Sequence, residues 1–198
     1  MNTIWEEIQQ IADSNNGFIR TGDIEAAGIS RPMLRKFVDA GKLERVRKGL
    51  YILAGDLADE FALIQIQSTK AIFSYGTALY LWGLSDRTPH IFDITVPQGT
   101  NMSRLKRDNE NLRCHYVQPE IYDLGIAEVR SPQGGTVRLY DKERCICDLI
   151  RDKEKVDIQI YRQAIKDYFN TRADRRKLLK YSKVLGVEEK VRTYMEVL

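Results

Sequence analysis

The chain has 198 residues, 43% of them hydrophobic and 30% charged, and a formal net charge of +3, a composition that excludes an intrinsically disordered chain. No apolar run approaches the roughly 20 residues of a membrane-spanning helix, and the first residues lack the basic and apolar segments of a signal peptide. Because the three cysteines are an odd and sparse set for a disulfide framework, we expect a cytoplasmic protein with no membrane partner.

Three helices are predicted at the start of the chain. Apolar residues recur at helical spacing over residues 4–12. Thr21 is expected to cap a short second helix, and Ser30 to cap a third that has Pro32 in its first turn, where the missing N–H costs nothing. The second and third helices are separated by only a short segment that contains Gly28, as in the turn of a helix-turn-helix.

A hairpin is predicted directly after the third helix. Residues 43–46 and 50–53 have the composition of two short strands, and residues 47–49 (Arg-Lys-Gly) form the tight turn between them. Three helices followed by a hairpin is the order of elements in a winged helix-turn-helix. We therefore expect residues 1–54 to be a winged helix-turn-helix that binds double-stranded DNA, with the third helix as the recognition helix.

Basic residues concentrate on the predicted recognition helix and hairpin. Between Arg31 and Lys48 there are seven basic residues against two acidic ones. The third helix is expected to bury Leu34, Phe37 and Val38, which leaves its cations free to contact bases or phosphates. The residues predicted to bind DNA are Thr21, Ser30, Arg31, Arg35, Lys36, Arg47 and Lys48. The alternative is a winged helix that serves only for protein contacts.

Residues 57–198 predict a second domain, after a boundary at residues 54–57. Two helices are expected over residues 58–69 and 78–82, on either side of the apolar segment 71–73. The later elements are strands at 91–96, 112–117, 126–130 and 136–140, and helices at 141–151, 157–169, 174–185 and 188–197. The fold class is therefore α+β, with a small sheet and a helical C-terminus.

The sequence offers no pattern typical of a catalytic or metal site. Cys114 and His115 are neighbours on a predicted strand, so their side chains point to opposite faces. Cys145 and Cys147 lie about 200° apart around a helix and cannot hold one metal together. The residue two after Asp93 is a threonine, so the aspartate pair of a nucleotidyltransferase is missing. We expect no metal, no cofactor and no enzymatic activity.

Four segments, taken together and in order, resemble the AbiEi antitoxins. They are residues 47–51 (RKGLY), 73–84 (FSYGTALYLWGL), 95–97 (TVP) and 141–149 (DKERCICDL). The resemblance implies the antitoxin of a type IV toxin–antitoxin system for abortive phage infection, which represses its own operon at inverted repeats. It also implies a nucleotidyltransferase-like toxin as functional partner without a stable complex. The protein would be a monomer or weak dimer in solution, with two copies on DNA.

A second basic cluster lies near the C-terminus. Its predicted contact residues are Arg172, Arg176, Lys180 and Lys183, of which the last three form a stripe on one helix face, opposite Leu178 and Leu185. We hypothesise that this cluster contacts DNA backbone or a neighbouring bound copy. A solvated face, or contact with the toxin or with its RNA substrate, are the alternatives.

Two other modes of action are open for the second domain. The protein could neutralise the toxin by direct contact, which a stoichiometric complex would reveal. It could also be an enzyme that reverses or blocks the toxin's modification, and its first structural sign would be pocket carboxylates with shifted pKa values.

Overall fold

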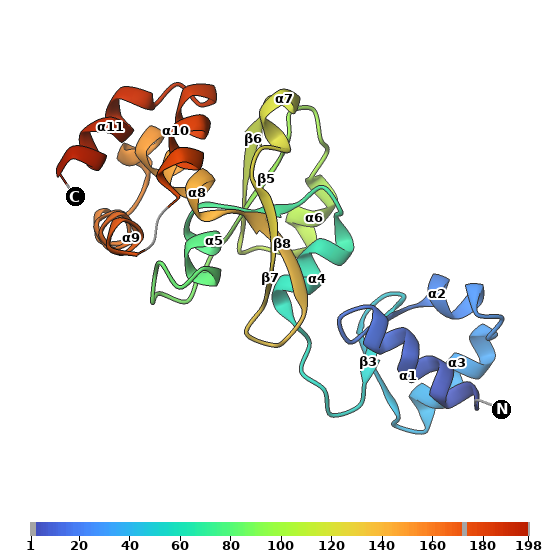
Figure 1. The fold of residues 1–198 in the computed structure, drawn as a ribbon. Helices are drawn as coiled ribbons and strands as arrows, with labels where there is room; N and C mark the ends of the chain where they lie inside the picture. The colour runs from blue at the N-terminus through green and yellow to red at the C-terminus, as the bar shows by residue number, and fades with distance from the viewer. Residues whose placement is uncertain (1–2, 172–173, 198) are drawn as a thin grey trace. The chain divides into compact units, whose positions relative to one another are not determined.

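Short helices and short strands are interspersed along residues 3–171 and 174–197, the residues that this computed structural model describes (Figure 1). The chain forms two compact units. The first comprises the residues up to Leu63 together with Arg130–Thr136, and the second comprises Ile64–Val129 and the residues from Val137 onward. The expected α+β class is confirmed, whereas the domain boundary at residues 54–57 stays a prediction.

The first unit contains the helices α1 (Ile4–Ser14), α2 (Thr21–Ala26) and α3 (Arg31–Asp39). At the start of α1, the Thr3 hydroxyl accepts the Glu6 N–H at 3.3 Å and the Glu6 carboxylate accepts the Thr3 N–H at 2.8 Å. This reciprocal capping box pairs N–H groups that the first turn of a helix otherwise leaves unpaired. The three helices lie where the spacing of apolar residues predicts them.

A three-stranded antiparallel sheet completes the first unit. It is formed by β1 (Phe18–Arg20), β2 (Leu43–Arg47) and β3 (Leu50–Leu53), in the order β1-β3-β2. The hairpin of β2 and β3 confirms the sequence prediction, but β1 was not predicted, because three residues are too few to show alternation. The presence of β1 also corrects the expected cap of α2. Thr21 is the first residue of that helix, and Arg20 precedes it without a side-chain cap.

The first unit has a hydrophobic core of its own. Its buried members are Ile8, Ala12, Ile19, Ile24, Ile29, Leu34 and Leu43. Of the three residues expected to be buried on α3, only Leu34 is, while Phe37 and Val38 are half-buried and pack against the core. The ring of Phe37 lies 5.3 Å from that of Trp5 on α1. Helix α3 is therefore fixed along one side only and exposes the other.

The second unit is built on a five-stranded mixed sheet with strand order β6-β5-β4-β8-β7. Its strands are β4 (Ile72–Phe73), β5 (Phe92–Pro97), β6 (Leu112–Val117), β7 (Ile126–Arg130) and β8 (Thr136–Tyr140). Strand β4 runs antiparallel to β5 and parallel to β8, and β5 runs parallel to β6. Four of these strands were predicted within one residue of their observed ends, whereas β4 was expected only as part of the apolar segment 71–73.

The helices from residue 60 onward are α4 (Glu60–Gln67), α5 (Tyr75–Leu81), α6 (Ser103–Asp108), α7 (Pro119–Tyr122), α8 (Lys142–Arg151), α9 (Ile158–Asn170), α10 (Arg175–Val184) and α11 (Glu188–Val197). A 3-10 turn at Lys153–Lys155 joins α8 to the helices that follow. Helix α4 begins two residues later than expected, because the Asp59 carboxylate caps it by accepting the N–H groups of Phe61 and Ala62. Helices α6 and α7 were not predicted. None of the helices within the described residues is long and apolar enough to cross a membrane.

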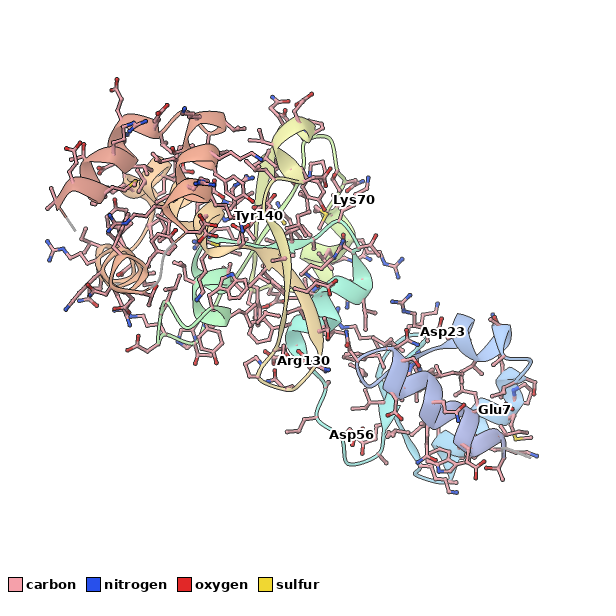
Figure 2. The ribbon with its side chains drawn as sticks, viewed as in Figure 1. Glu7, Asp23, Asp56, Lys70, Arg130 and Tyr140 are labelled. Atoms are coloured by element: carbon pink, nitrogen blue, oxygen red, sulfur yellow. The ribbon has the colours of Figure 1, made fainter. Side chains whose placement is uncertain are left out.

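Helix α8 is the centre of the second unit. Every residue from Glu143 to Ile150 is buried, and α8 packs against α5, α9 and α10. Figure 1 shows α9, α10 and α11 gathered beside it. Tyr140, which precedes α8 at the end of β8, is also buried (Figure 2). Charged side chains on α8 therefore have to find partners inside the protein.

Candidate nucleic-acid interface and cavity

The exposed side of α3 carries cations from its first residue. Arg31 and Arg35 have side chains that are 73% and 83% exposed, and Lys36 is also exposed. Ser30 precedes the helix and is exposed, and its side chain makes no cap hydrogen bond. The structure thus brings together the four residues predicted to contact DNA from this helix.

Two of these cations form surface ion pairs. Arg31 pairs with Glu25 of α2 through its Nε, and the Glu25 carboxylate raises the pKa of Arg31. Arg35 lies 3.8 Å from Asp39, one turn further along α3. Exposed pairs of this kind contribute little to stability, so a phosphate or a base could displace them at small cost.

The turn between β2 and β3 supplies the remaining predicted contacts. Lys48 is exposed in the turn, and Arg47 is half-buried at the end of β2. Gly49 has φ +75, a left-handed conformation that glycine adopts without strain. A Cβ placed on Gly49 would lie 3.4 Å from the hydroxyl oxygen of Thr21, which places Thr21 beside the turn. Thr21 itself is half-buried.

The predicted stripe on α10 is partly confirmed in its geometry. Leu178 and Ser182 are fully buried, while Arg176, Lys180 and Lys183 are exposed. Lys183 lies 3.9 Å from Glu188 at the start of α11. Arg172 lies outside the described residues.

A cavity of about 570 Å³ opens in the second unit, within the usual volume range of ligand sites. It lies where α5, β5, β6, α7 and the end of α8 meet the start of α9. Its polar lining comes chiefly from Tyr75, Asp93, Arg113, His115, Arg151, Asp152 and Lys155. No sequence pattern assigned a function to this set of residues.

Tyr75 enters the cavity from a strained backbone position. It follows β4 and begins α5 with φ +44, which is unusual for a bulky side chain. Its hydroxyl donates to Asp152 at 2.7 Å and accepts from Arg151 at 3.1 Å. Burial, with the charge of Asp148, raises the pKa of Tyr75, so the phenol stays protonated. Strain of this kind is retained where the surroundings fix it, and it occurs often at functional sites.

His115 and Asp93 form the part of the cavity wall next to Tyr75. His115 Nε2 lies 2.8 Å from Asp93 Oδ1, and Arg113 Nη1 lies 3.6 Å from the same oxygen. The His115 ring also stacks on Tyr75, with ring centroids 4.2 Å apart. The parallel register of β5 and β6 brings these residues together, because Asp93 pairs with Arg113 and His115 follows two residues later.

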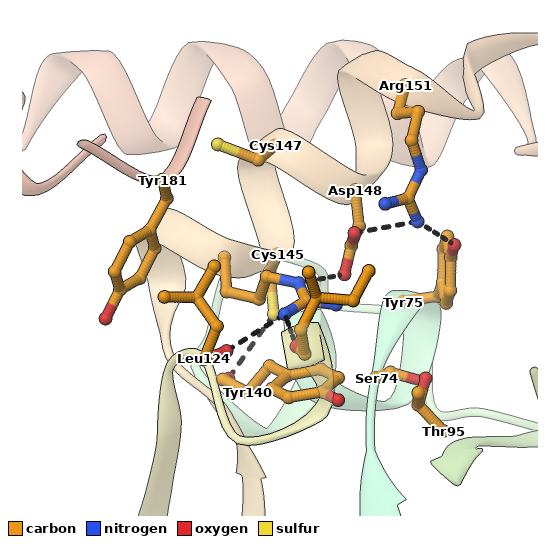
Figure 3. Close-up of polar contacts among 12 residues, drawn as sticks. Ser74, Tyr75, Thr95, Leu124, Tyr140, Cys145, Cys147, Asp148, Arg151 and Tyr181 are labelled. Atoms are coloured by element: carbon orange, nitrogen blue, oxygen red, sulfur yellow. Dashed lines mark hydrogen bonds and ion pairs between the residues drawn. The ribbon is translucent and has the colours of Figure 1, made fainter. Parts of the chain in front are cut away.

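A chain of ion pairs along α8 connects the buried interior to this cavity. Arg144 donates to Asp148 at 2.9 Å, and Arg151 lies 2.9 Å from the other carboxylate oxygen of Asp148. Figure 3 shows Arg151 between Asp148 and Tyr75. Burial raises the pKa of Asp148, against the opposing effect of the two arginines.

The cysteines of α8 are buried structural residues. Burial raises the pKa of Cys147 to about 12 and that of Cys145 well above its ordinary value. A buried protonated thiol is a poor nucleophile and a poor metal ligand. Within residues 3–171 and 174–197, no group of three or more His, Cys, Asp or Glu side chains is arranged to hold a metal ion.

Residues 6–54 match the family model described as "Transcriptional regulator, AbiEi antitoxin". The N-terminal segment is therefore similar to that of the AbiEi antitoxins. The match runs from α1 to the residue after β3 and includes the exposed cations of α3 and of the β2–β3 turn. It confirms the resemblance drawn from the sequence, and it concerns a family of regulators rather than a class of enzymes.

The fold of the chain also has a likeness among solved structures. The crystal structure of the RV2827C protein from Mycobacterium tuberculosis superposes with a TM-score of 0.59 and 14% sequence identity, over 99% of this chain and 82% of that one. At this identity the likeness concerns the fold alone. No curated protein matches the chain in sequence.

A cavity carboxylate with a shifted pKa was expected as the first structural sign of an enzyme. Asp152 is such a residue, but the shift of its pKa has a structural cause. Asp152 lines the cavity. Burial alone would raise the pKa of Asp152, but hydrogen bonds from Lys155 and Tyr75 and the charge of Arg151 lower it. A carboxylate held ionised by three donors stabilises the fold and is a weak proton acceptor. The shift therefore gives no support to an enzyme.

We expect Asp152→Asn to change how stability depends on pH. A lowered pKa in the folded state adds stability above the unfolded pKa of about 3.9, and this is lost as pH falls through the folded pKa. Because Asp152 is partly solvated, the variant should lose less than about 1 kcal/mol at neutral pH and decline less steeply in acid. Urea unfolding at pH 7 and in acid measures both effects, with exposed Asp123→Asn as control. Parallel pH profiles for Asp152→Asn and wild type would contradict the prediction.

Proposed function

We propose that this AbiEi-type protein is an antitoxin that binds the promoter of its own operon and represses it. The observation that carries the proposal is the family match over residues 6–54, because the same segment displays exposed arginines and lysines on α3 and on the β2–β3 turn. Cations on a helix that is free along one side are suited to phosphates and base edges of DNA.

We infer that the first unit acts as a winged helix-turn-helix. Helices α2 and α3 are joined by a short turn in which Gly28 has φ +76, and the β2–β3 hairpin follows α3. In this proposal α3 enters the major groove with Arg31, Arg35 and Lys36. Lys48 and Arg47 on the wing contact the neighbouring backbone or minor groove.

The remaining features are proposed from the family resemblance. The toxin is a nucleotidyltransferase-like protein encoded beside the antitoxin in a type IV system that confers phage resistance. The antitoxin opposes it without a stable complex, and two copies bind inverted repeats in the promoter. Co-expression and purification of both proteins tests the absence of a complex, since a stoichiometric complex would instead favour neutralisation by direct contact.

Gel shifts of the full chain with its own upstream DNA test the proposed repressor. We expect binding to that DNA, much weaker binding to a scrambled duplex, and a steep loss of affinity with added salt. Equal binding to both duplexes would contradict sequence-specific repression. Residues 1–56, which include the whole core cluster of the first unit, should bind the same site without cooperativity if the second unit supports paired binding.

Charge reversal on α10 tests whether its basic stripe takes part. In Arg176→Glu/Lys180→Glu, we expect weaker operator binding and a flatter salt dependence, because released counterions scale with neutralised phosphates. Both side chains are exposed, so the fold should be kept. Arg162→Glu/Lys166→Glu, a similarly exposed pair on α9, is the matched control. Unchanged binding by the α10 variant would show that the stripe is a solvated face.

A further inference from the structure

We propose that the cavity of the second unit binds a small organic anion, a carboxylate or phosphate ester attached to a planar or apolar body. This site goes beyond the proposed repressor and antitoxin function, which makes no use of the residues around Tyr75 and His115. The evidence comes from the exposure of the charges in the wall, from the fixed aromatic pair and from the apolar side of the cavity.

The two most exposed charges of the cavity wall are positive, and the most exposed acid, Asp157, has a side chain that is 47% exposed. The side chains of Arg113 and Lys155 are 55% and 79% exposed, whereas those of Asp93 and Asp152 are 9% and 16% exposed. Both carboxylates are also held by protein donors, Asp93 by His115 and Asp152 by Tyr75. Lys155 also bonds to Asp152 at 2.8 Å, and Arg113 lies 3.6 Å from Asp93. Because both cations are largely exposed, an anion entering the cavity can still reach their remaining N–H groups.

The third acid of the wall is also engaged by the protein. Asp157 caps α9 by accepting the backbone N–H groups of Gln159 and Ile160, at 2.8 and 3.2 Å. Arg87 lies 3.4 Å from its other oxygen. These hydrogen bonds to the backbone lower the pKa of Asp157 and orient its carboxylate toward the helix start. It opposes an anion less than a free aspartate would.

The aromatic pair gives the site a fixed shape before any ligand binds. The strained φ of Tyr75 and its two hydrogen bonds hold the phenol ring against His115. Gly76 lies so close to Asp93 that a Cβ there would come within 3.3 Å of the carboxylate. Groups held this way lose little entropy on binding, which favours a specific ligand over loosely attracted ions.

An apolar wall lies beside these polar groups. It is formed by Val117, Ile121, Val156 and Ile160. Inorganic anions gain nothing from such a surface, whereas a ring or short aliphatic body buries area against it. A polar end with donors and an apolar side together define the amphipathic anion that we propose as ligand.

Isothermal titration calorimetry of the full chain with phenyl phosphate, phenylacetate, inorganic phosphate and benzyl alcohol tests this assignment. We expect phenyl phosphate or phenylacetate to bind, and inorganic phosphate and benzyl alcohol to bind at least tenfold more weakly. Arg113→Gln/Lys155→Gln should lower the affinity for the organic anion tenfold or more. Arg162→Gln/Lys166→Gln on α9 removes two exposed cations outside the cavity and should leave the affinity unchanged.

Three outcomes would overturn the proposal. The first is that neither organic anion binds, and the second is that inorganic phosphate binds with the same affinity as the organic anion. The third is that the α9 control loses as much affinity for the organic anion as the cavity variant does. Both variants keep their core residues, and equal melting temperatures would show that folding does not explain a loss. A gel shift with the cavity variant separates this site from the proposed repressor, since operator binding should persist when the anion no longer binds.

Discussion

Arg144→Met is expected to lower the free energy of unfolding of the second unit by about 3–5 kcal/mol, the usual cost of removing one partner from a buried ion pair. The Arg144 side chain is fully buried, so no solvent can replace what it donates. Methionine has a comparable length and fills most of the space, which makes the loss one of charge and hydrogen bonds rather than of volume.

The expected effect is large because Arg144 serves several groups at once. Its Nε donates to Asp148 at 2.9 Å, and its Nη1 donates to the carbonyl oxygens of Ile121 and Leu124 at 2.7 and 3.0 Å. Its guanidinium also lies 4.3 Å from the centre of the Tyr140 ring. Without it, the buried Asp148 carboxylate keeps only Arg151, and the carbonyl groups of Ile121 in α7 and of Leu124 just after that helix lose this donor.

Tryptophan fluorescence can isolate the second unit in this experiment. The sequence has two tryptophans. Trp5 lies on α1 in the first unit, and Trp82 donates its indole N–H to the Tyr140 carbonyl at 2.8 Å, beside the Arg144 site. In a Trp5→Phe background, urea unfolding followed by fluorescence reports on Trp82 alone. Exposed Arg162→Met on α9 is the control and should change stability by less than about 0.5 kcal/mol.

A double-mutant cycle identifies the cause of the loss. Arg144→Met/Asp148→Asn should cost less than the sum of the single changes, because the uncompensated charge is then gone as well. The coupling should reach about 1 kcal/mol or more. Additive losses would show that Arg144 stabilises the unit through its packing on Tyr140 and not through its ion pair.

Most of the secondary structure could be predicted from the sequence because it follows from periodicity and capping. Helix α8 is an example, since Asp141 precedes it and accepts the Arg144 N–H at 2.8 Å, as its position in the sequence indicates. Helix α6 was missed because its six residues bury only Leu105, which leaves no apolar period to detect. Strand β1 was missed because its three residues are too few to show alternation, although it pairs with β3 over all its residues.

The two sites differ in how far the sequence could reveal them. The exposed cations of α3 could be predicted from local spacing, because the apolar residues that mark the buried face of a helix also show which face is exposed. The cavity depends on the register of parallel strands, which joins Asp93 to His115, and on the positive φ of Tyr75, which nothing local dictates. One signal was available. Asp93 is the one charged residue in a buried strand, and a charge in such a place requires a partner.

Arg35→Ala is expected to weaken operator binding by about 1–3 kcal/mol, roughly 5- to 150-fold, and to relax the preference at one base pair. Of the two arginines on α3, Arg35 is the more exposed, and its 3.8 Å pair with Asp39 is loose enough to open on binding. Arginine can then grip the O6 and N7 atoms of a guanine with two hydrogen bonds.

Lys48→Ala provides the contrast that separates base reading from charge. Lys48 lies in the turn between β2 and β3, where we propose a phosphate contact. Its loss should weaken binding to all DNA sequences about equally and reduce the slope of the salt dependence by about one. Competition gel shifts with single base-pair substitutions in the operator measure both behaviours side by side. If Arg35→Ala weakens every sequence equally, Arg35 contacts phosphate and the base readout lies elsewhere on α3.

Asp39→Asn tests the same contact from the other direction. The carboxylate of Asp39 lies on the exposed side of α3, 3.8 Å from Arg35. In the proposed complex it would both occupy Arg35 and repel the DNA backbone. Removing its charge should therefore strengthen operator binding while Arg35 is present, and strengthen it less in the Arg35→Ala background. The side chains of Arg35, Lys48 and Asp39 are all exposed. The melting temperatures of these variants should therefore stay within the small range of surface substitutions. Binding by Asp39→Asn that equals wild type would mean that α3 is not the surface that meets DNA.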